Sequence, residues 1–123
     1  MTSLNPATKI TILHVTAERG LSMRDVDANL ESYQSLVGGY IECLRLTPRI
    51  DCWLNEEGKL NGLHLTAIVL DHDGEPVDVI AGPFFLASHD DEGNTVGLDG
   101  ETLPEAVAAL RKHLVPLPRV ETV

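Results

Sequence analysis

The chain has 123 residues and a formal net charge of −10, from nineteen acidic and nine basic side chains. This length suits one domain with one core and is too short for two ordinary domains. A nonspecific grip on phosphate backbones needs clustered Lys and Arg, so the negative charge argues against direct contact with nucleic acid. With 43% hydrophobic and 23% charged residues, the composition is that of a folded globular protein.

No apolar run approaches the roughly 20 residues of a membrane-spanning helix. Residues 1–8 also lack the basic start and apolar core of a secretory signal. We therefore expect no membrane partner and a cytoplasmic location.

The first predicted element is an inner β-strand over residues 9–17, where β-branched and apolar residues face both sides. A helix over residues 26–37 follows, because apolar residues recur there at three- and four-residue spacing. Gly38 fits the left-handed position that ends helices, since glycine has no Cβ to clash at positive φ.

Strands over residues 40–46 and 51–54 are predicted to form a hairpin, because Pro48 between them cannot donate to a strand ladder. Each strand carries one cysteine. If the hairpin is symmetric about its turn, Cys43 and Cys52 lie directly opposite each other, near but mostly beyond disulfide geometry. A register shifted by the preference of Pro48 for the first central turn position separates them. We expect two packed, reduced thiols, too few for a disulfide framework or a structural zinc site.

A second reversal is predicted at residues 55–58, with Asn55 bonding to its own backbone and Gly58 in the left-handed conformation. Residues 59–60 then resume pairing briefly. The apolar run over residues 63–70 fits a strand or a short helix by period alone, and we favour one or two helical turns.

Turns are predicted at residues 71–76 and 90–94, with a strand over 77–87 that is bent or bulged at Gly82 and Pro83. Residues 95–98 predict a short edge strand.

The last helix begins with the capping box Thr102-Leu103-Pro104-Glu105, in which the Thr102 oxygen accepts the Glu105 amide proton, and ends near His113. We therefore expect an α+β fold. Residues 1–115 form one domain, with an antiparallel sheet of four or five strands, two main helices and a short third helix from residues 63–70. Residues 116–123 are expected to be a loose tail.

Two motifs carry a family resemblance. Residues 34–42 (Gln-Ser-Leu-Val-Gly-Gly-Tyr-Ile-Glu) and 55–63 (Asn-Glu-Glu-Gly-Lys-Leu-Asn-Gly-Leu) resemble domain of unknown function 3846, and residues 78–83 look like the family's glycine-containing strand. The resemblance implies a mobile-element context, in phages, plasmids and bacterial genomes that are often actinobacterial, without a characterised reaction. Small phage proteins of this sort often serve as inhibitors, sponges or decoys against host defence.

The candidate ligand-binding residues come from these two motifs. Backbone amides at Gly38 and Gly39, with the charge of Lys59, could cradle a nucleotide-like small molecule. The helix precedes the glycines instead of following them, however, which favours helix capping over phosphate binding. The full candidate set is Gln34, Gly38, Gly39, Tyr40, Glu42, Asn55, Glu56 and Lys59.

Catalytic and metal sites have weaker signals. A carboxylate cluster of Glu42, Glu56 and Glu57 with His64 as a base would need all groups within reach of one substrate, which spacing does not show. His14 is expected to be a hydrogen-bonded core histidine. We assign no catalytic residue, no metal ligand and no cofactor. Two groups of possible metal ligands are expected to be polar turns: His72 with Asp71 and Asp73, and His89 with Asp90, Asp91 and Glu92.

The expected function is that of a small acidic accessory protein that binds a host protein or itself, as a phage inhibitor of host defence would. One alternative is a sponge that binds a nucleotide signal. A further alternative is a small hydrolase-like enzyme.

Overall fold

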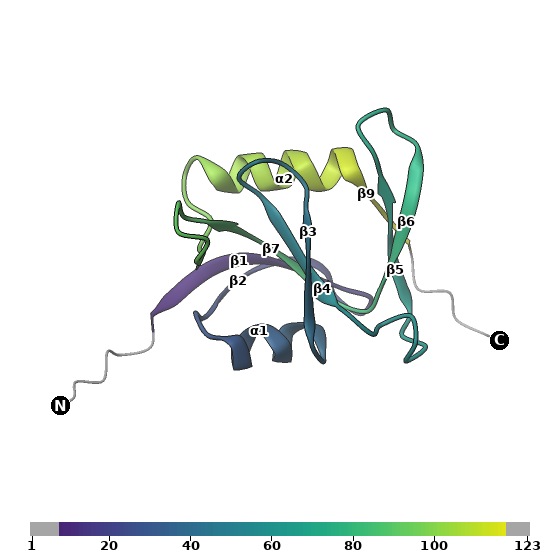
Figure 1. The fold of residues 1–123 in the computed structure, drawn as a ribbon, viewed down its shortest axis with the longest axis horizontal. Helices are drawn as coiled ribbons and strands as arrows, with labels where there is room; N and C mark the ends of the chain where they lie inside the picture. Colours follow the sequence, from purple (N-terminus) through teal and green to yellow (C-terminus); the bar gives the residue numbers. More distant parts are fainter. Residues whose placement is uncertain (1–7, 118–123) are drawn as a thin grey trace.

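The computed structural model describes residues 8–117 and contains two antiparallel sheets and two helices (Figure 1). Sheet A has the strand order β2-β1-β7-β4-β3, with β8 paired to β7, and sheet B has the order β6-β5-β9. The strands are β1 (Lys9–Thr16), β2 (Gly20–Asp27), β3 (Ile41–Arg45), β4 (Asp51–Asn55), β5 (Leu65–Leu70), β6 (Pro76–Ala81), β7 (Phe84–His89), β8 (Thr95–Val96) and β9 (Leu114–Pro116), and the helices are α1 (Leu30–Val37) and α2 (Thr102–His113).

Sheet A lies between the two helices, with α1 on one face and α2 on the other (Figure 1). Its middle strand β7 alternates, so that Phe85 and Ala87 pack in the α1 cluster while Phe84 and Leu86 pack in the α2 cluster. All four side chains are buried. A strand that is covered on both faces is continuously apolar, which explains the apolar run over residues 84–87.

The predicted α+β class, with antiparallel pairing and two helices, is confirmed. The predicted sheet of four or five strands fits only roughly, because the strands divide into two sheets. The division occurs at Gly82, whose φ of 92° lets the chain pass from β6 in sheet B to β7 in sheet A. Residues 77–87 are therefore two strands in different sheets and not one bent strand.

Two elements differ from the prediction, although each forms a hairpin with a strand next to it in the sequence, β2 with β1 and β5 with β6. Residues 26 and 27, predicted as the start of the helix, belong to β2. The helix begins at Leu30, after Asn29, whose Oδ1 accepts the Ser32 N–H at 2.7 Å. Residues 65–70 form β5 between β6 and β9 and not a short third helix. The predicted left-handed Gly38 is confirmed at φ 81°.

The β3–β4 hairpin is confirmed, in a register that separates the cysteines. Leu44 lies opposite Cys52 and Cys43 lies opposite Trp53, so the two thiols face opposite sides of the sheet and are free. Burial, helped by the negative charge of Asp51, raises the pKa of Cys43 to about 11. Burial also raises the pKa of Cys52. Both groups therefore remain thiols at neutral pH.

Helix α2 is confirmed, but its capping box is wrong. Asp99 Oδ1, and not Thr102, accepts the backbone N–H groups of Glu101 and Thr102, both at 2.9 Å. The Glu105 carboxylate instead bonds Arg49 Nη2 at 2.6 Å and the Thr47 hydroxyl at 2.8 Å. It thereby ties α2 to the β3–β4 loop, and these bonds lower the pKa of Glu105.

The acidic turns at residues 71–76 and 90–94 are confirmed. Asp71 accepts the N–H groups of residues 73 and 75, and Asp90 accepts those of residues 92 and 94. The edge strand predicted at residues 95–98 is shorter, at Thr95–Val96. Neither helix described here has the length and hydropathy needed to cross a membrane.

Pairing also continues past the predicted domain boundary at residue 115. Strand β9 ends at Pro116, and the Leu117 N–H donates to the Thr66 carbonyl at 2.9 Å. The rest of the predicted loose tail, residues 118–123, lies outside the described residues.

Turns occupy residues 56–62, so the brief pairing predicted at residues 59–60 is wrong. Gly58 is not left-handed but is required by space, because a Cβ there would lie 2.2 Å from the Ala81 carbonyl oxygen. The glycine lets this loop pass against the end of β6.

We predict that Gly58→Ala lowers the free energy of unfolding by about 1–3 kcal/mol, the usual cost of forcing extra atoms into a packed site. The matched control is Gly100→Ala, where a Cβ meets nothing within 4 Å and φ is not positive. Urea denaturation of both variants measures the difference, and equal stabilities would contradict the close approach.

Candidate functional site

A polar cavity of about 260 Å³ lies between β3, β4 and β6. Four predicted ligand-binding residues line it: Glu42, Asn55, Glu56 and Lys59. The structure adds Asp78, which no motif in the sequence marks as a site residue. The two family-like motifs therefore do meet in space, at one wall of this cavity.

The charges of this cavity disfavour an anionic ligand. Lys59 Nζ already bonds Asp78 Oδ1 at 2.5 Å, and this bond lowers the pKa of the Asp78 carboxyl. Glu42 and Glu56 add two more carboxylates to the lining. Three acidic groups against one ammonium repel a phosphate.

Gln34, Gly38, Gly39 and Tyr40 lie at the end of α1 and do not line the cavity. The N–H groups of Gly38 and Gly39 both donate to the Gln34 carbonyl, at 2.8 and 3.1 Å. They cap the helix and are not turned toward a ligand. The Tyr40 side chain is exposed, and its carbonyl accepts the Glu56 N–H at 2.9 Å.

Asn55 joins the helix end to the cavity loop. Its Nδ2 donates to the Val37 carbonyl at 3.1 Å, and its Oδ1 accepts the Glu57 N–H at 2.8 Å. The side chain is 4% exposed. Gly39 also belongs to this junction, because a Cβ there would lie 2.9 Å from Asn55 Nδ2. Asn55 is therefore a structural residue.

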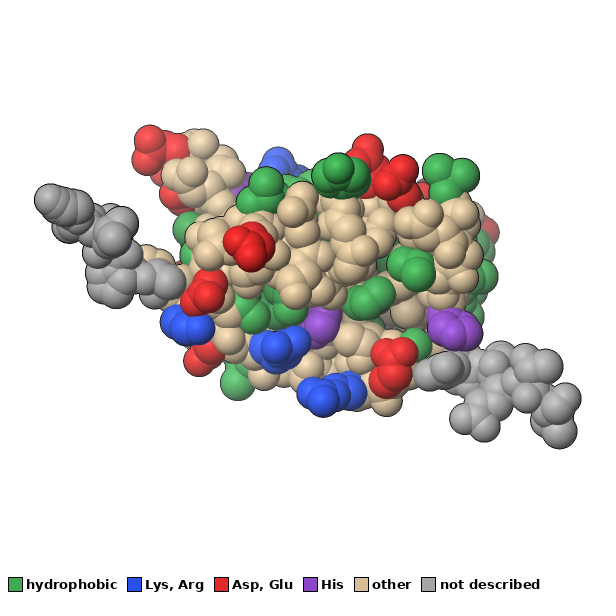
Figure 2. Space-filling view, turned by 90° about the horizontal axis from the view of Figure 1, so that it is seen from below, with side chains coloured by type: hydrophobic (Ala, Val, Ile, Leu, Met, Phe, Trp, Pro, Cys, Tyr) green, Lys and Arg blue, Asp and Glu red, His purple; other side chains and the backbone are tan. Residues whose placement is uncertain are grey.

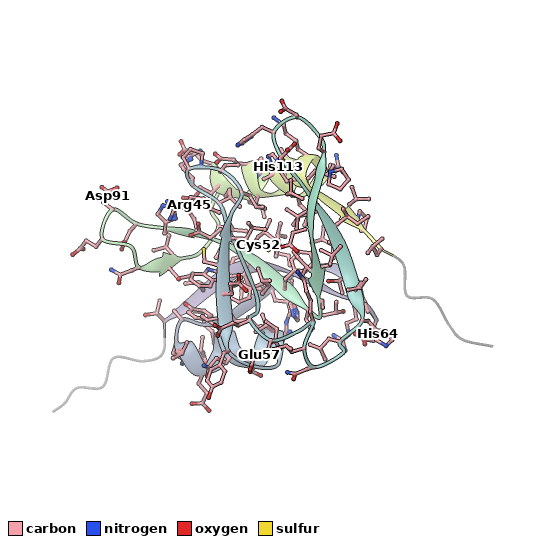
Figure 3. The ribbon with its side chains drawn as sticks, turned by 45° about the vertical axis from the view of Figure 1, so that its right-hand side comes forward. Arg45, Cys52, Glu57, His64, Asp91 and His113 are labelled. Atoms are coloured by element: carbon pink, nitrogen blue, oxygen red, sulfur yellow. The ribbon has the colours of Figure 1, made fainter. Side chains whose placement is uncertain are left out.

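The predicted base His64 lies apart from Glu42 and Glu56. It lines a separate cavity of about 120 Å³ with Leu63, Gly82 and others. Figure 3 shows His64 at one end of the β5–β6 sheet and Glu57 on the loop below β4. The carboxylates and the imidazole are not assembled around one cavity.

The histidines of the candidate metal groups contact other residues. His89 Nδ1 bonds Asp51 Oδ2 at 2.8 Å, and the His72 ring lies edge-on to His113 with centroids 5.4 Å apart. Within residues 8–117, no group of three or more His, Cys, Asp or Glu side chains could hold a metal ion.

Sequence reasoning missed the bonds around Asp51. Its buried carboxylate accepts a hydrogen bond from Arg45 Nε at 3.2 Å, and its second oxygen lies 2.8 Å from His89 Nδ1. His89 is 38 residues away in sequence. No local pattern signals such a pair, which forms only because β4 and β7 are neighbours.

A second missed feature is the outer edge of β2. No described strand pairs with this edge, and Leu21 and Met23 on it are 48% and 63% exposed. The available signal was the alternation of these residues with polar Ser22 and Arg24 after the turn at residues 17–19.

An apolar groove lies beside Leu21, between β1, β5 and α2. Its cavity of about 260 Å³ is lined by Val15, Leu21, Phe84, Leu110 and Leu114 among others. A second cavity of about 280 Å³ shares Val15, Gly20, Thr66 and Pro116 with it. The groove and the exposed side chains of β2 form one surface, which we call the β2 edge surface.

Charged groups on the opposite side of the molecule are dispersed. On the face that carries α1, Figure 2 shows acidic and basic side chains interspersed among neutral and hydrophobic ones. This face has no single dominant charge for a partner to recognise.

His14 is the predicted hydrogen-bonded core histidine, and the structure confirms it. It is 7% exposed, with Nε2 2.9 Å from the Leu36 carbonyl and Nδ1 3.3 Å from Arg24 Nη1. Burial is the main cause that lowers its pKa from the ordinary value of 6.5. Nε2 donates to the carbonyl, so Nδ1 accepts from the guanidinium.

We predict that the free energy of unfolding falls as the pH drops below about 6.5. In this window the unfolded chain binds a proton at His14 that the folded chain does not bind, because folding lowers the pKa of His14. Stability therefore rises with pH. Chemical denaturation at pH 5.5 and 7.5 measures the change, and His14→Gln should flatten it. An unchanged pH dependence in the variant would exclude His14 as its source.

We predict that Asn55→Ala costs about 1–3 kcal/mol of stability, because the Val37 carbonyl and the Glu57 N–H lose their buried partner. Asn55→Asp is the matched control, since its carboxylate still accepts from Glu57 but cannot donate to Val37. In thermal denaturation, Asn55→Asp should be less stable than the unchanged chain and more stable than Asn55→Ala. A ligand-binding role would instead leave stability unchanged.

The comparisons with known proteins identify a family. No curated protein and no solved structure matches the chain significantly. The family model described as Domain of unknown function (DUF3846) matches residues 10–111, from β1 through most of α2. The match includes the motifs at residues 34–42 and 55–63 that first suggested it. The chain belongs to the DUF3846 family.

Proposed function

We propose that this protein acts by binding another polypeptide, which adds a strand to sheet A at the β2 edge surface. The observation that supports this most is a long open strand edge beside an apolar groove. Strand β2 has eight residues and carries two exposed apolar side chains, Leu21 and Met23.

An edge strand presents backbone N–H and C=O groups to any extended chain. Natural proteins usually protect such edges by shortening them, charging them or covering them. Residues 20–23 of β2 carry no charge, although Arg24, Asp25 and Asp27 follow them. The first half of the strand is therefore the half best suited to pairing.

Side chains supply the specificity in strand addition. Backbone hydrogen bonds hold the added strand, and alternate side chains enter neighbouring pockets. Leu21 and Met23 lie on the face of Val15 and Leu13, which are their partners in β1. An apolar side chain of an added strand on this face would meet Leu21 at the groove mouth.

The alternatives have less support. The occupied glycine amides and the acidic cavity lining count against a nucleotide sponge. The raised thiol pKa values and the separation of His64 from the carboxylates count against the hydrolase. Binding to a host protein and inhibition of host defence remain predictions from the family resemblance.

We predict that Met23→Glu weakens partner binding by about tenfold or more, because it places a carboxylate in the apolar half of the edge. The matched control is Val77→Glu, which introduces the same carboxylate on β6 at a residue about as exposed as Met23. Cross-linking in cells, followed by identification of the cross-linked peptides, measures binding at residues 20–27. Cross-links that do not involve β2, or that persist in Met23→Glu, would contradict the proposal.

A further inference from the structure

We infer that the segment added at the β2 edge surface is an extended strand of another protein with the residue order basic, acidic, apolar, any residue, apolar. This inference rests on the proposed function and names the chemistry of its partner. When the added strand runs antiparallel to β2, its five positions lie opposite Asp25, Arg24, Met23, Ser22 and Leu21, in that order.

The open part of β2 presents different side chains on its two faces. Leu21, Met23 and Asp25 share the face that holds α2, because Met23 lies opposite Leu13 of the α2 cluster. Successive side chains of a strand point to opposite faces, so Arg24 lies on the face that holds α1. An added strand therefore meets two apolar groups and a carboxylate on one face and a guanidinium group on the other.

Strand β1 holds both charged side chains in place. Arg24 Nη1 lies 3.3 Å from His14 Nδ1, and the Thr11 hydroxyl donates to Asp25 Oδ1 at 2.6 Å. Arg24 and Asp25 are nevertheless exposed. The guanidinium group keeps further N–H donors, and the carboxylate keeps a second oxygen. Since these side chains are already ordered, a partner that bonds them loses less side-chain entropy.

Charge complementarity assigns the first two positions of the partner. Opposite charges directly across a strand pair stabilise it, and like charges destabilise it. Asp27 is already paired with Lys9 Nζ at 2.8 Å, so Asp25 is the carboxylate next to the apolar half of the edge. A basic residue opposite Asp25 and an acidic residue opposite Arg24 each gain an opposite charge.

The apolar positions follow from the groove. Partner residues opposite Met23 and Leu21 lie two apart on the α2 face, where both side chains of β2 are more than 45% exposed. Leu21 lines the apolar cavity of about 260 Å³ together with Val15 and Leu110. An aliphatic side chain opposite Leu21 therefore lies beside this cavity. The residue opposite Ser22 points to the other face, where the motif sets no requirement.

The direction of the added strand fixes the order of the motif. Every strand pair within residues 8–117 is antiparallel, including the β1–β2 pair that the new strand would extend. Antiparallel pairing is also slightly more stable per residue than parallel pairing. A parallel strand would need the reverse order, which gives the reversed peptide as a control of identical composition.

Two synthetic peptides test the charge assignment. Thr-Lys-Glu-Val-Thr-Leu-Thr carries the inferred motif, and Thr-Glu-Lys-Val-Thr-Leu-Thr exchanges its two charges. Titration of the isotope-labelled full chain, followed by the amide NMR signals of residues 20–27, measures both affinities up to millimolar peptide. The first peptide should bind about tenfold more tightly, because the exchange places two like-charge pairs across the edge. The reversed peptide should also bind more weakly than the first.

The double variant Arg24→Asp/Asp25→Arg should reverse the preference between the two peptides. Thermal denaturation shows whether it is folded, since both side chains also contact β1. The milder variant Asp25→Asn provides a second measurement, because it should reduce the tenfold preference to about threefold.

The outcomes separate the inference from the proposed function. Equal binding of the charge-exchanged peptide, or an unchanged preference in folded Asp25→Asn, would overturn the charge assignment and leave strand addition at β2 in place. Concentration-dependent shifts of residues 20–27 without peptide would also overturn the inference, because a second copy would then be the occupant. Peptide signals that never involve residues 20–27, with cross-links that avoid β2, would overturn the proposed function itself.

Discussion

Strand β7 must be covered on both faces, because Phe85 and Ala87 point to α1 while Phe84 and Leu86 point to α2. Burying an aromatic or aliphatic side chain stabilises the fold by about 1.5–3 kcal/mol, so these side chains hold both helices over the middle of sheet A. The position of β7 between β1 and β4 follows from this requirement. The strands furthest from it, β2 and β3, become the edges.

On the α1 face the packing reaches β2, where Val26 is buried, but on the α2 face it ends before β2. Leu13 of β1 is 4% exposed, whereas Met23, its direct partner in β2, is 63% exposed. Sheet B fills the other side of α2, through Ala67, Val69 and Leu114. The apolar groove is the space left where β1, β5 and α2 meet. The same requirement that buries β7 thus leaves an open strand edge and a groove on one side of the molecule.

Local signals predicted the elements that are specified locally. Gly38 ended the first helix, Pro48 marked the hairpin, and the apolar spacing of α2 placed it correctly. The end of β2 was missed because Val26 also fits the apolar spacing of the helix that follows, and β5 was missed because a short apolar run fits a helix or a strand by period alone. The candidate site was predicted in part: the two motifs do meet, but at the structural residue Asn55 and beside an acidic cavity. The bonds of Asp51 to His89 depend on strand neighbours and have no local signature.

The residues that maintain the fold are thus distinct from the exposed residues that can contact a partner. Asn55 and Gly58 have buried bonds or close contacts, so changes there alter stability first. Arg19, Leu21 and Met23 are exposed, and changes at these positions leave the core contacts intact. Burial of Leu21 and Met23 under an added strand would remove apolar surface from water without any rearrangement of the core. The edge of β2 can therefore gain or lose a partner while the rest of the fold stays the same.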